Sequence, residues 1–268
     1  MLKNFMVFFK KEEKRIINNF LNYGYIIGNV EDKNSLNFIS KLIKKSTFSK
    51  FSKNKYSKNL NNFHKYISKF NLNEKRVSII NKINKNKNLR AKCFNLARNH
   101  LYALVGNELM MQKKINLSIQ LPKDSSSLLP VHSDVWSGDS PYEINLWIPL
   151  VNCYRTKSMY ILRQKYLNDF FKKMRSGRIK SSKQIYNIIK KKIKWIDIKY
   201  GQFLIFNQTL PHGNLVNLEN QTRWSLNCRF KSLFSPYKDK KIGEFFLPIT
   251  TRPMTKIGFN FKYPFVQK

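Results

Sequence analysis

The sequence predicts an α+β protein in which helices come first and a β-sandwich or barrel core follows. Apolar patterns with the period of a helix dominate the chain up to about residue 105. At least seven short β-type runs follow, and two lysine-rich helical segments interrupt them. A hydrophobic content of 42% in 268 residues supplies enough apolar material for a substantial core. Helices followed by a set of strands favour a β-core that is backed by helices.

The first part of the chain carries the helical patterns. Residues 9–23 form an amphipathic pattern, YGYIIGNV then predicts a short strand, and residues 32–43 predict a second helix. Asp32 or Asn34 is placed to cap that second helix. The apolar face of the first helix consists of Ile16, Ile17, Phe20 and Leu21.

Residues 44–73 are rich in Ser, Asn and Lys and have weak periodicity, so we expect a long, partly helical surface excursion. Two further helices are expected in residues 74–105, and Gly106 ends the second of them. The lysine-rich helical segments of the second half cover residues 165–174 and 182–192. The β-type runs are INLSIQL, LPVHSDV, YEINLWIPLV, SMYILR, WIDIKY, QFLIFN and TRWSLNCRF.

These patterns divide the chain into three parts of one domain, residues 1–268. We expect a mainly helical support over residues 1–112, the β-barrel core over 113–235 and a C-terminal wrap around the barrel over 236–268. The sequence shows no internal repeat.

The formal net charge of +36 arises almost entirely from lysine spread along the whole chain. Asn, Ile, Phe and Tyr are also abundant, and this bias is typical of an AT-rich genome. The charge therefore names no partner, although a positive field favours phosphate-bearing or carboxylate-bearing substrates.

The cysteines and the apolar runs predict the compartment. Cys93, Cys153 and Cys228 are isolated, without the spacing of a disulfide framework or a zinc ribbon. The apolar run near the N-terminus is too short for a signal peptide, and no stretch is long enough to cross a membrane. We therefore expect a soluble cytoplasmic protein.

A metal site is the first candidate for chemistry. In the run VHSDV, read as a strand, His132 and Asp134 project to the same side and can share one cation. The pattern His-x-Asp is common by chance, so a third ligand is needed. His64 and His100 lie in helical surroundings, whereas His212 follows an apolar strand at a position typical of a barrel mouth. Two His and one Asp form the facial triad of non-haem Fe(II), and a zinc hydrolase accepts the same ligands.

A row of polar residues follows His212. Arg223 and Ser225 come eleven and thirteen positions after it, and in a strand they share a face with Asn227 and Arg229. A guanidinium in such a row can bind a carboxylate through two parallel hydrogen bonds. The alternative is that the row is the solvent face of an edge strand.

Together these residues resemble the phytanoyl-CoA dioxygenase-like branch of the Fe(II)/2-oxoglutarate-dependent dioxygenases. That branch has an HxD motif, a distal His, and an Arg about eleven residues later with a Ser shortly after it. NLWIPL is similar to its Trp-x-Pro-Leu strand, and GQFLIFNQTLPHGN resembles its stretch before the distal His. The run from His132 also resembles a bacterial subgroup found among carbohydrate-biosynthesis genes. Gln202 replaces a frequent Asp, and ILRQKYL stands where relatives have Pro-Gly-Ser-His.

The resemblance implies a double-stranded β-helix, that is, a jelly-roll, cupin-like core with N-terminal and inserted helices packed on it. It implies that His132, Asp134 and His212 bind Fe(II), and that Arg223 and Ser225 bind 2-oxoglutarate. We add Asn145 to the co-substrate residues, because its strand parity places a buried amide in the barrel interior. The implied reaction uses O2 and couples oxidative decarboxylation of 2-oxoglutarate to oxidation, by default hydroxylation, of a small molecule. A sugar or a nucleotide-linked sugar is the candidate substrate.

Weaker candidates and two alternative functions stay open. Trp147 shares the parity of Asn145 but is more often a core residue. The other candidates near the pocket or its mouth are Gln120, Lys123, Trp136 and Tyr142, the last two flanking the turn SGDSP. The alternative functions are a zinc-dependent hydrolase with the same triad and a basic nucleic-acid-binding protein with an inert barrel, for which the sequence has no binding motif. The oligomeric state does not follow from the sequence.

Overall fold

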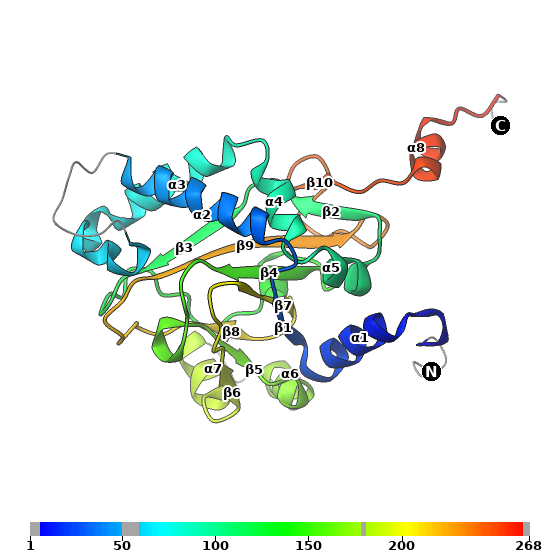
Figure 1. The fold of residues 1–268 in the computed structure, drawn as a ribbon. Coiled ribbons are helices and arrows are strands. Elements are labelled where there is room, and N and C mark those ends of the chain that lie inside the picture. Colours follow the sequence, from blue (N-terminus) through cyan, green and yellow to red (C-terminus); the bar gives the residue numbers. More distant parts are fainter. Residues whose placement is uncertain (1–5, 50–58, 178–180, 265–268) are drawn as a thin grey trace.

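The computed structural model describes residues 6–49, 59–177 and 181–264, and Figure 1 shows its helices and strands. The strands form two sheets with antiparallel pairing throughout. The larger sheet contains β1 (Tyr25–Asn29), β2 (Leu109–Gln112), β3 (Asn116–Gln120), β4 (Ile144–Pro149), β7 (Gln202–Asn207), β9 (Arg223–Ser232) and β10 (Phe246–Pro248). The smaller sheet contains β5 (Tyr160–Leu162), β6 (Ile193–Trp195) and β8 (His212–Gly213). The predicted α+β class is confirmed.

Strand β9 organises the larger sheet. One of its edges pairs with β4, from Pro149 opposite Ser225 to Ile144 opposite Phe230. Its other edge pairs with β3 over its first half and with β2 over its end. With both edges paired, β9 lies inside the sheet, and because successive side chains of a strand point to opposite faces, its side chains reach two different layers of the protein.

The outward-pointing side chains of β9 are apolar and meet the helices. Trp224 and Phe230 are fully buried, with ring centroids 4.9 Å from Phe63 and 6.4 Å from Phe94, respectively. The helical layer drawn above the sheet in Figure 1 includes α2 (Lys33–Phe48), α3 (Leu72–Asn84) and α4 (Leu89–Asn95), and α5 (Arg98–Val105) follows α4 beside β4. The polar side chains of β9 must therefore face the space between the two sheets.

The helices predicted in the first half of the chain are present, with differences in one exposed residue and in the number of helices. The first predicted helix is α1 (Lys11–Tyr23), and Asp32 caps α2 by accepting a hydrogen bond from the Ser35 amide at 3.1 Å. Leu21, predicted on the apolar face, is 52% exposed, whereas Ile16 is buried. Residues 74–105 contain three helices instead of two, because the polar residues around Asn88 interrupt the helical chain between α3 and α4.

The described part of residues 44–73 is partly helical, as predicted, but it is not only a surface excursion, because Phe48, Leu60 and Phe63 are buried. Residues up to Phe48 continue α2, and the 3-10 helix η2 (Leu60–Lys65) packs against β9; residues 50–58 lie outside the described chain. Trp224 Nε1 donates to the Leu60 carbonyl at 3.0 Å, and the Thr222 amide donates to the Asn61 carbonyl at 2.8 Å. The buried Lys157 also donates to Asn61, at 2.7 Å from its Oδ1. Short 3-10 turns bury apolar residues without the period of an α-helix, which explains the weak pattern.

The lysine-rich segments of the second half are helical as predicted, forming α6 (Leu167–Arg175) and α7 (Ser182–Ile189). The run LPVHSDV is not a regular strand: His132 makes an isolated bridge with His212, and Asp134 begins the 3-10 helix η4 (Asp134–Ser137). The sequence patterns missed β2, β8 and β10, which have four, two and three residues and are too short to show alternation.

The C-terminal part pairs with the sheet through β10 (Phe246–Pro248). Strand β10 pairs with β2, as a wrap would, but α8 (Pro253–Asn260) has no buried residue and projects from the body of the protein in Figure 1. In the described parts of the chain, we find no helix with the length and apolarity needed to span a bilayer.

Candidate metal centre

Three side chains from two neighbouring segments converge at the β8 edge of the smaller sheet. His132 Nε2 lies 3.9 Å from Asp134 Oδ1, and His212 Nε2 lies 3.9 Å from Asp134 Oδ2. One donor atom from each residue falls within 4.8 Å of the others, which is close enough to hold a single ion. The two histidines are brought together by backbone hydrogen bonds of 2.9 and 2.8 Å between them. The described residues contain no other group of three His, Cys, Asp or Glu with this arrangement.

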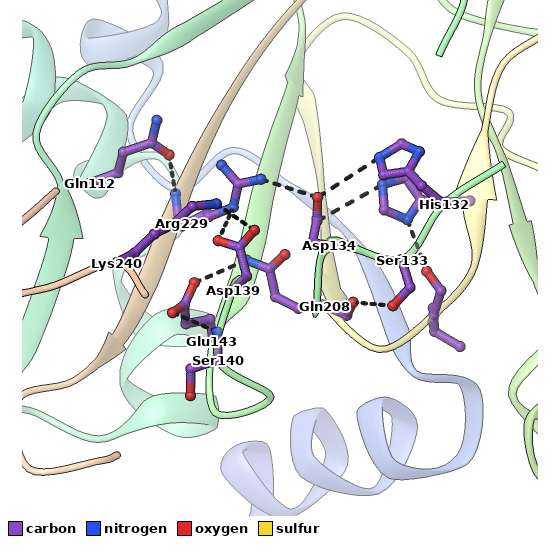
Figure 2. Close-up of polar contacts among 12 residues, drawn as sticks. Gln112, His132, Ser133, Asp134, Asp139, Ser140, Glu143, Gln208, Arg229 and Lys240 are labelled. Atoms are coloured by element: carbon purple, nitrogen blue, oxygen red, sulfur yellow. Dashed lines mark hydrogen bonds and ion pairs between the residues drawn. The ribbon is translucent and has the colours of Figure 1, made fainter. Parts of the chain in front are cut away.

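The predicted residues are thus adjacent, although the reason given for Asp134 was wrong. It does not share a strand face with His132, because the chain turns into η4 at this residue. The turn itself carries the carboxylate to the histidines. Figure 2 shows the contacts of Asp134 with the imidazoles on one side and with Arg229 on the other.

Both imidazoles are oriented by backbone carbonyls. His132 Nδ1 lies 2.8 Å from the Pro130 carbonyl oxygen, and His212 Nδ1 lies 2.9 Å from that of Leu210. A carbonyl only accepts hydrogen bonds, so we assign the proton of each neutral ring to Nδ1 and the free lone pair to Nε2. Burial lowers the pKa of His212 to about 4, which keeps that ring neutral. Carbonyl partners of this kind fix the tautomer of metal-binding histidines.

Asp134 is held in its ionised form. Burial alone would raise the pKa of its carboxyl, but His212, Arg229 and His132 together lower the pKa below its usual value. Arg229 Nη2 donates to Asp134 Oδ1 at 3.1 Å. With its amide nitrogen turned toward Asp134, Gln208 donates to Oδ2 and accepts from Arg229 Nε at 3.1 Å.

A cavity of about 210 Å³ opens beside the three side chains. The inward faces of β4 and β9 line it, and the lining includes Asn145, Trp147, Arg223, Asn227 and Arg229. The polar row of β9 is therefore internal and does not form the solvent face of an edge strand. Arg223 and Ser225 are 3% and 1% exposed.

Several polar atoms along this cavity have no hydrogen-bond partner within the described chain. Three of them belong to lining residues: Arg223 Nε, Asn145 Oδ1 and Asn227 Oδ1. A fourth, Ser225 Oγ, lies between Arg223 and Asn227 on β9 and is not part of the lining. Buried polar groups are normally satisfied, so three unsatisfied ones around one cavity indicate a site for a polar ligand.

Arg223 is a buried cation without a counter-ion. Its Nη1 donates to the Ser158 carbonyl at 3.3 Å and its Nη2 to Ser118 Oγ at 2.9 Å, and both acceptors are neutral. The described residues pair no carboxylate with it. Burial lowers the pKa of Arg223 to about 10, because the charged form has lost its hydration. An anionic ligand would supply the missing charge.

A network of charged groups behind the triad was not predicted. Asp139 Oδ1 lies 3.0 Å from Arg229 Nε, and Asp139 Oδ2 lies 2.5 Å from Lys240 Nζ. The Ser140 amide donates to Glu143 at 3.0 Å, and burial, aided by Asp139, raises the pKa of Glu143 to about 7. The turn SGDSP supplies Asp139 and Ser140, so the sequence pointed to the right loop but to its flanking aromatic residues instead of its carboxylate.

The weaker candidates divide between the cavity and the surface. Trp147 lines the cavity, whereas Gln120 donates to the Leu215 carbonyl at 2.6 Å and is not part of the lining. Lys123 is exposed, and Trp136 and Tyr142 are 42% and 58% exposed outside the cavity lining. The remaining histidines have partners elsewhere: His64 contacts Thr222, and His100 contacts Glu31.

No protein-family model matches the sequence, and no curated protein matches it either. Solved structures do resemble the fold. A structure described as the "Non-heme monooxygenase, ThoJ-Ni complex" aligns with a TM-score of 0.54 at 12% identity, over 88% of this chain and 84% of its own. The "non-heme alpha ketoglutarate dependent carbocyclase SnoK from nogalamycin biosynthesis" aligns with a TM-score of 0.55 at 12% identity, over 86% of this chain and 87% of its own.

EctD from S. alaskensis, in its apoform, aligns with a TM-score of 0.54 at 12% identity, over 83% of this chain and 78% of its own. Likeness at this identity shows the fold. It confirms the predicted jelly-roll core with helices packed on it. The phytanoyl-CoA dioxygenase-like branch stays a prediction.

Proposed function

We propose that this protein is an Fe(II)- and 2-oxoglutarate-dependent oxygenase that acts on a small molecule. One observation carries the proposal: a triad with two oriented imidazoles and a carboxylate shares a buried cavity with Arg223, a cation that lacks a counter-ion. The triad is suited to a divalent metal and Arg223 to an anion. The two solved structures ThoJ and SnoK, described as non-haem enzymes, support this assignment through their common fold.

The donor set fits Fe(II). Two imidazole nitrogens and one carboxylate oxygen are ligands that this ion accepts, and three protein ligands leave positions open for other molecules. His132, Asp134 and His212 would hold the metal through Nε2, a carboxylate oxygen and Nε2. Both imidazoles are already in the tautomer that binding requires, and burial keeps His212 unprotonated.

The unsatisfied groups of the cavity fit 2-oxoglutarate. The guanidinium of Arg223 would bind a carboxylate through its unpaired Nε–H and a neighbouring N–H, in the forked geometry that arginine favours. Ser225, two residues along the same face, would donate its hydroxyl to that carboxylate. Asn145 presents an amide on the neighbouring strand β4, opposite Arg229, for a further polar contact.

When bound together, the iron and 2-oxoglutarate supply, with O2, the oxidising chemistry in which the co-substrate loses CO2 and the substrate is oxidised. The protein contributes position and the exclusion of water. Trp147, Phe206 and Met159 form apolar walls of the cavity, so that the polar groups there are directed at bound molecules and not at solvent.

For the substrate, we propose a small molecule oxidised by hydroxylation, with a sugar or nucleotide-linked sugar as the first class to test. SnoK is described as an enzyme of nogalamycin biosynthesis, which supports a small-molecule substrate. The membership of the phytanoyl-CoA dioxygenase-like branch and a cytoplasmic location belong to the same proposal.

A zinc-dependent hydrolase would use the same triad, but it has no need for the buried Arg223.

The test of the proposed oxygenase function is succinate release. Protein stripped of metal is loaded with Fe(II) without oxygen, mixed with 2-oxoglutarate and exposed to air, because this class turns over slowly without its substrate. We expect Fe(II)-dependent succinate that is lost in His132→Ala.

Equal succinate from wild type and His132→Ala would contradict the proposal. Firmly bound zinc together with no affinity for 2-oxoglutarate would favour the hydrolase. Binding of nucleic acid that weakens steeply with salt and ignores metal would favour the third function, a basic nucleic-acid-binding protein.

A further inference from the structure

Arg229 joins the candidate metal ligand Asp134 to a second buried carboxylate. Its Nη2 donates to Asp134 Oδ1 at 3.1 Å, and its Nε lies 3.0 Å from Asp139 Oδ1. Figure 2 shows the guanidinium between the two carboxylates, with Lys240 beside Asp139. The Arg229 side chain is 13% exposed, and the Asp139 side chain is fully buried.

The guanidinium is fixed from several directions. The Arg229 amide donates to Gln112 Oε1 at 3.2 Å, which anchors its backbone on β9. Its guanidinium carbon lies 5.9 Å from the centre of the Phe245 ring. Lys240 contacts the other oxygen of Asp139, Oδ2, at 2.5 Å, and so does not take part in the contact of Arg229 with Oδ1. The position of Arg229 therefore does not depend on Asp134.

The Asp134 carboxylate is consequently held on the side away from the histidines. Arg229 contacts Oδ1, and the Gln208 amide contacts Oδ2. The Gln208 backbone is tied to the same loop, because Ser133 Oγ donates to the backbone carbonyl of Gln208 at 2.8 Å. With both oxygens held, the carboxylate cannot rotate freely about its bond to the chain.

We propose that Arg229 is a positioning residue of the metal centre, which fixes the Asp134 carboxylate so that its remaining lone pairs face His132 and His212. The proposal rests on the metal site of the proposed function, but it holds for any divalent ion bound by the triad. Asp139 is the anchor that keeps the guanidinium in place and offsets its charge.

The two ways in which Arg229 could act on the metal centre, by orienting Asp134 or by its charge, predict opposite changes in metal affinity when Arg229 is removed. A cation 3.1 Å from a ligand oxygen repels a bound metal ion, so charge alone predicts that removal of Arg229 strengthens metal binding. Orientation predicts the reverse, because loss of a partner that orients a metal ligand typically weakens metal affinity about 10-fold to 100-fold. Arg229→Lys separates the two effects further, since lysine keeps the charge and loses the planar fork.

The experiment measures Co(II) binding to metal-free protein by calorimetry and by the visible absorption of bound Co(II). Wild type is compared with Arg229→Met, Arg229→Lys and Lys240→Met. The matched control, Lys240→Met, removes the other cation on Asp139 without touching Asp134. Thermal unfolding of each metal-free protein reports any general loss of structure.

We expect both Arg229 variants to bind Co(II) about 10-fold to 100-fold more weakly, with an altered Co(II) spectrum, and Lys240→Met to change affinity less than about threefold. Unchanged or tighter binding in Arg229→Met overturns the proposal, and so does wild-type affinity in Arg229→Lys. Absence of Co(II) binding by wild type also overturns it. Succinate release by wild type is a separate measurement, so the proposed function can stand when this proposal fails.

Discussion

Replacing Arg223 with methionine should stabilise the ligand-free protein and remove its affinity for 2-oxoglutarate. The guanidinium is buried and has only neutral hydrogen-bond partners, Ser158 and Ser118. A residue kept for folding would not carry an uncompensated charge at this depth. The two effects have opposite signs because the charge is unfavourable in the empty cavity and favourable when a carboxylate is bound.

The magnitudes follow from burial and from hydrogen bonding. Burial lowers the pKa of Arg223 from 12.5 to about 10, which corresponds to a cost of about 3 kcal/mol for the charge in the folded protein. Methionine removes this cost but leaves two acceptors unpaired, at about 1 kcal/mol each. The free energy of unfolding should therefore rise by about 1 kcal/mol, or about 2–4 °C in melting temperature.

The loss of affinity should be much larger. Removing one partner of a buried ion pair costs about 3–5 kcal/mol, which is a weakening of roughly two to three and a half orders of magnitude. Arg223→Lys keeps the charge and loses one of two charge-assisted bonds, worth about 1.5–3 kcal/mol. That variant should bind 2-oxoglutarate roughly 10-fold to 100-fold more weakly than wild type.

Two measurements test the pair of effects. Thermal unfolding is followed on metal-free protein, and 2-oxoglutarate binding is followed by calorimetry on the Co(II)-loaded protein. Co(II) affinity itself should be the same in wild type and in Arg223→Met, because Arg223 has no contact with the triad. A less stable Arg223→Met protein with undiminished 2-oxoglutarate affinity would refute the assignment of Arg223 to the co-substrate.

Three further outcomes are expected. Ser225→Ala should weaken 2-oxoglutarate binding about 5-fold to 10-fold in the same calorimetric assay, because it removes one hydrogen bond, and should leave Co(II) affinity unchanged. Burial raises the pKa of Glu143 from 4.5 to about 7, so between these pH values the folded protein holds a proton that the unfolded chain releases. Stability should therefore fall by about 2 kcal/mol as pH rises through that window, and Glu143→Gln should flatten the dependence in urea unfolding at pH 5 and pH 7.5. Phe63→Ala should destabilise the protein by about 3–5 kcal/mol in the same assay, because the ring is fully buried against Trp224.

The features that could be predicted from the sequence are those set by the pattern of neighbouring residues. The alternation in β9 is long and clear, so one stretch was enough to predict that Arg223 and Ser225 share a face. Whether that face points inward or to solvent could not be predicted from the alternation. His132 and Asp134 were correctly paired, but the strand that was to bring them together is a 3-10 turn. A His-x-Asp pattern looks the same in the sequence whether its residues form a strand or lead into a 3-10 helix.

Contacts between distant segments could not be predicted in this way. Asp139 looks like a turn residue, and nothing near it in the sequence indicates its ion pairs with Arg229 and Lys240. The 3-10 helix η2 was missed for a related reason, since Leu60 and Phe63 are buried by β9 and not by a neighbour in the chain. Such features depend on the completed fold.

The attachment of η2 to β9 has a consequence for how this protein can diverge. Hydrogen bonds from η2 reach Thr222 and Trp224, the residues on either side of Arg223. Both of these bonds end on backbone carbonyls, those of Leu60 and Asn61, whereas Phe63 contacts Trp224 through its side chain, with ring centroids 4.9 Å apart. A substitution at Phe63 therefore shifts the neighbours of Arg223 without altering any residue that lines the cavity. Relatives that share every cavity residue can differ in their affinity for 2-oxoglutarate, and the cause will lie at positions such as Phe63, which an alignment restricted to the active site would leave out.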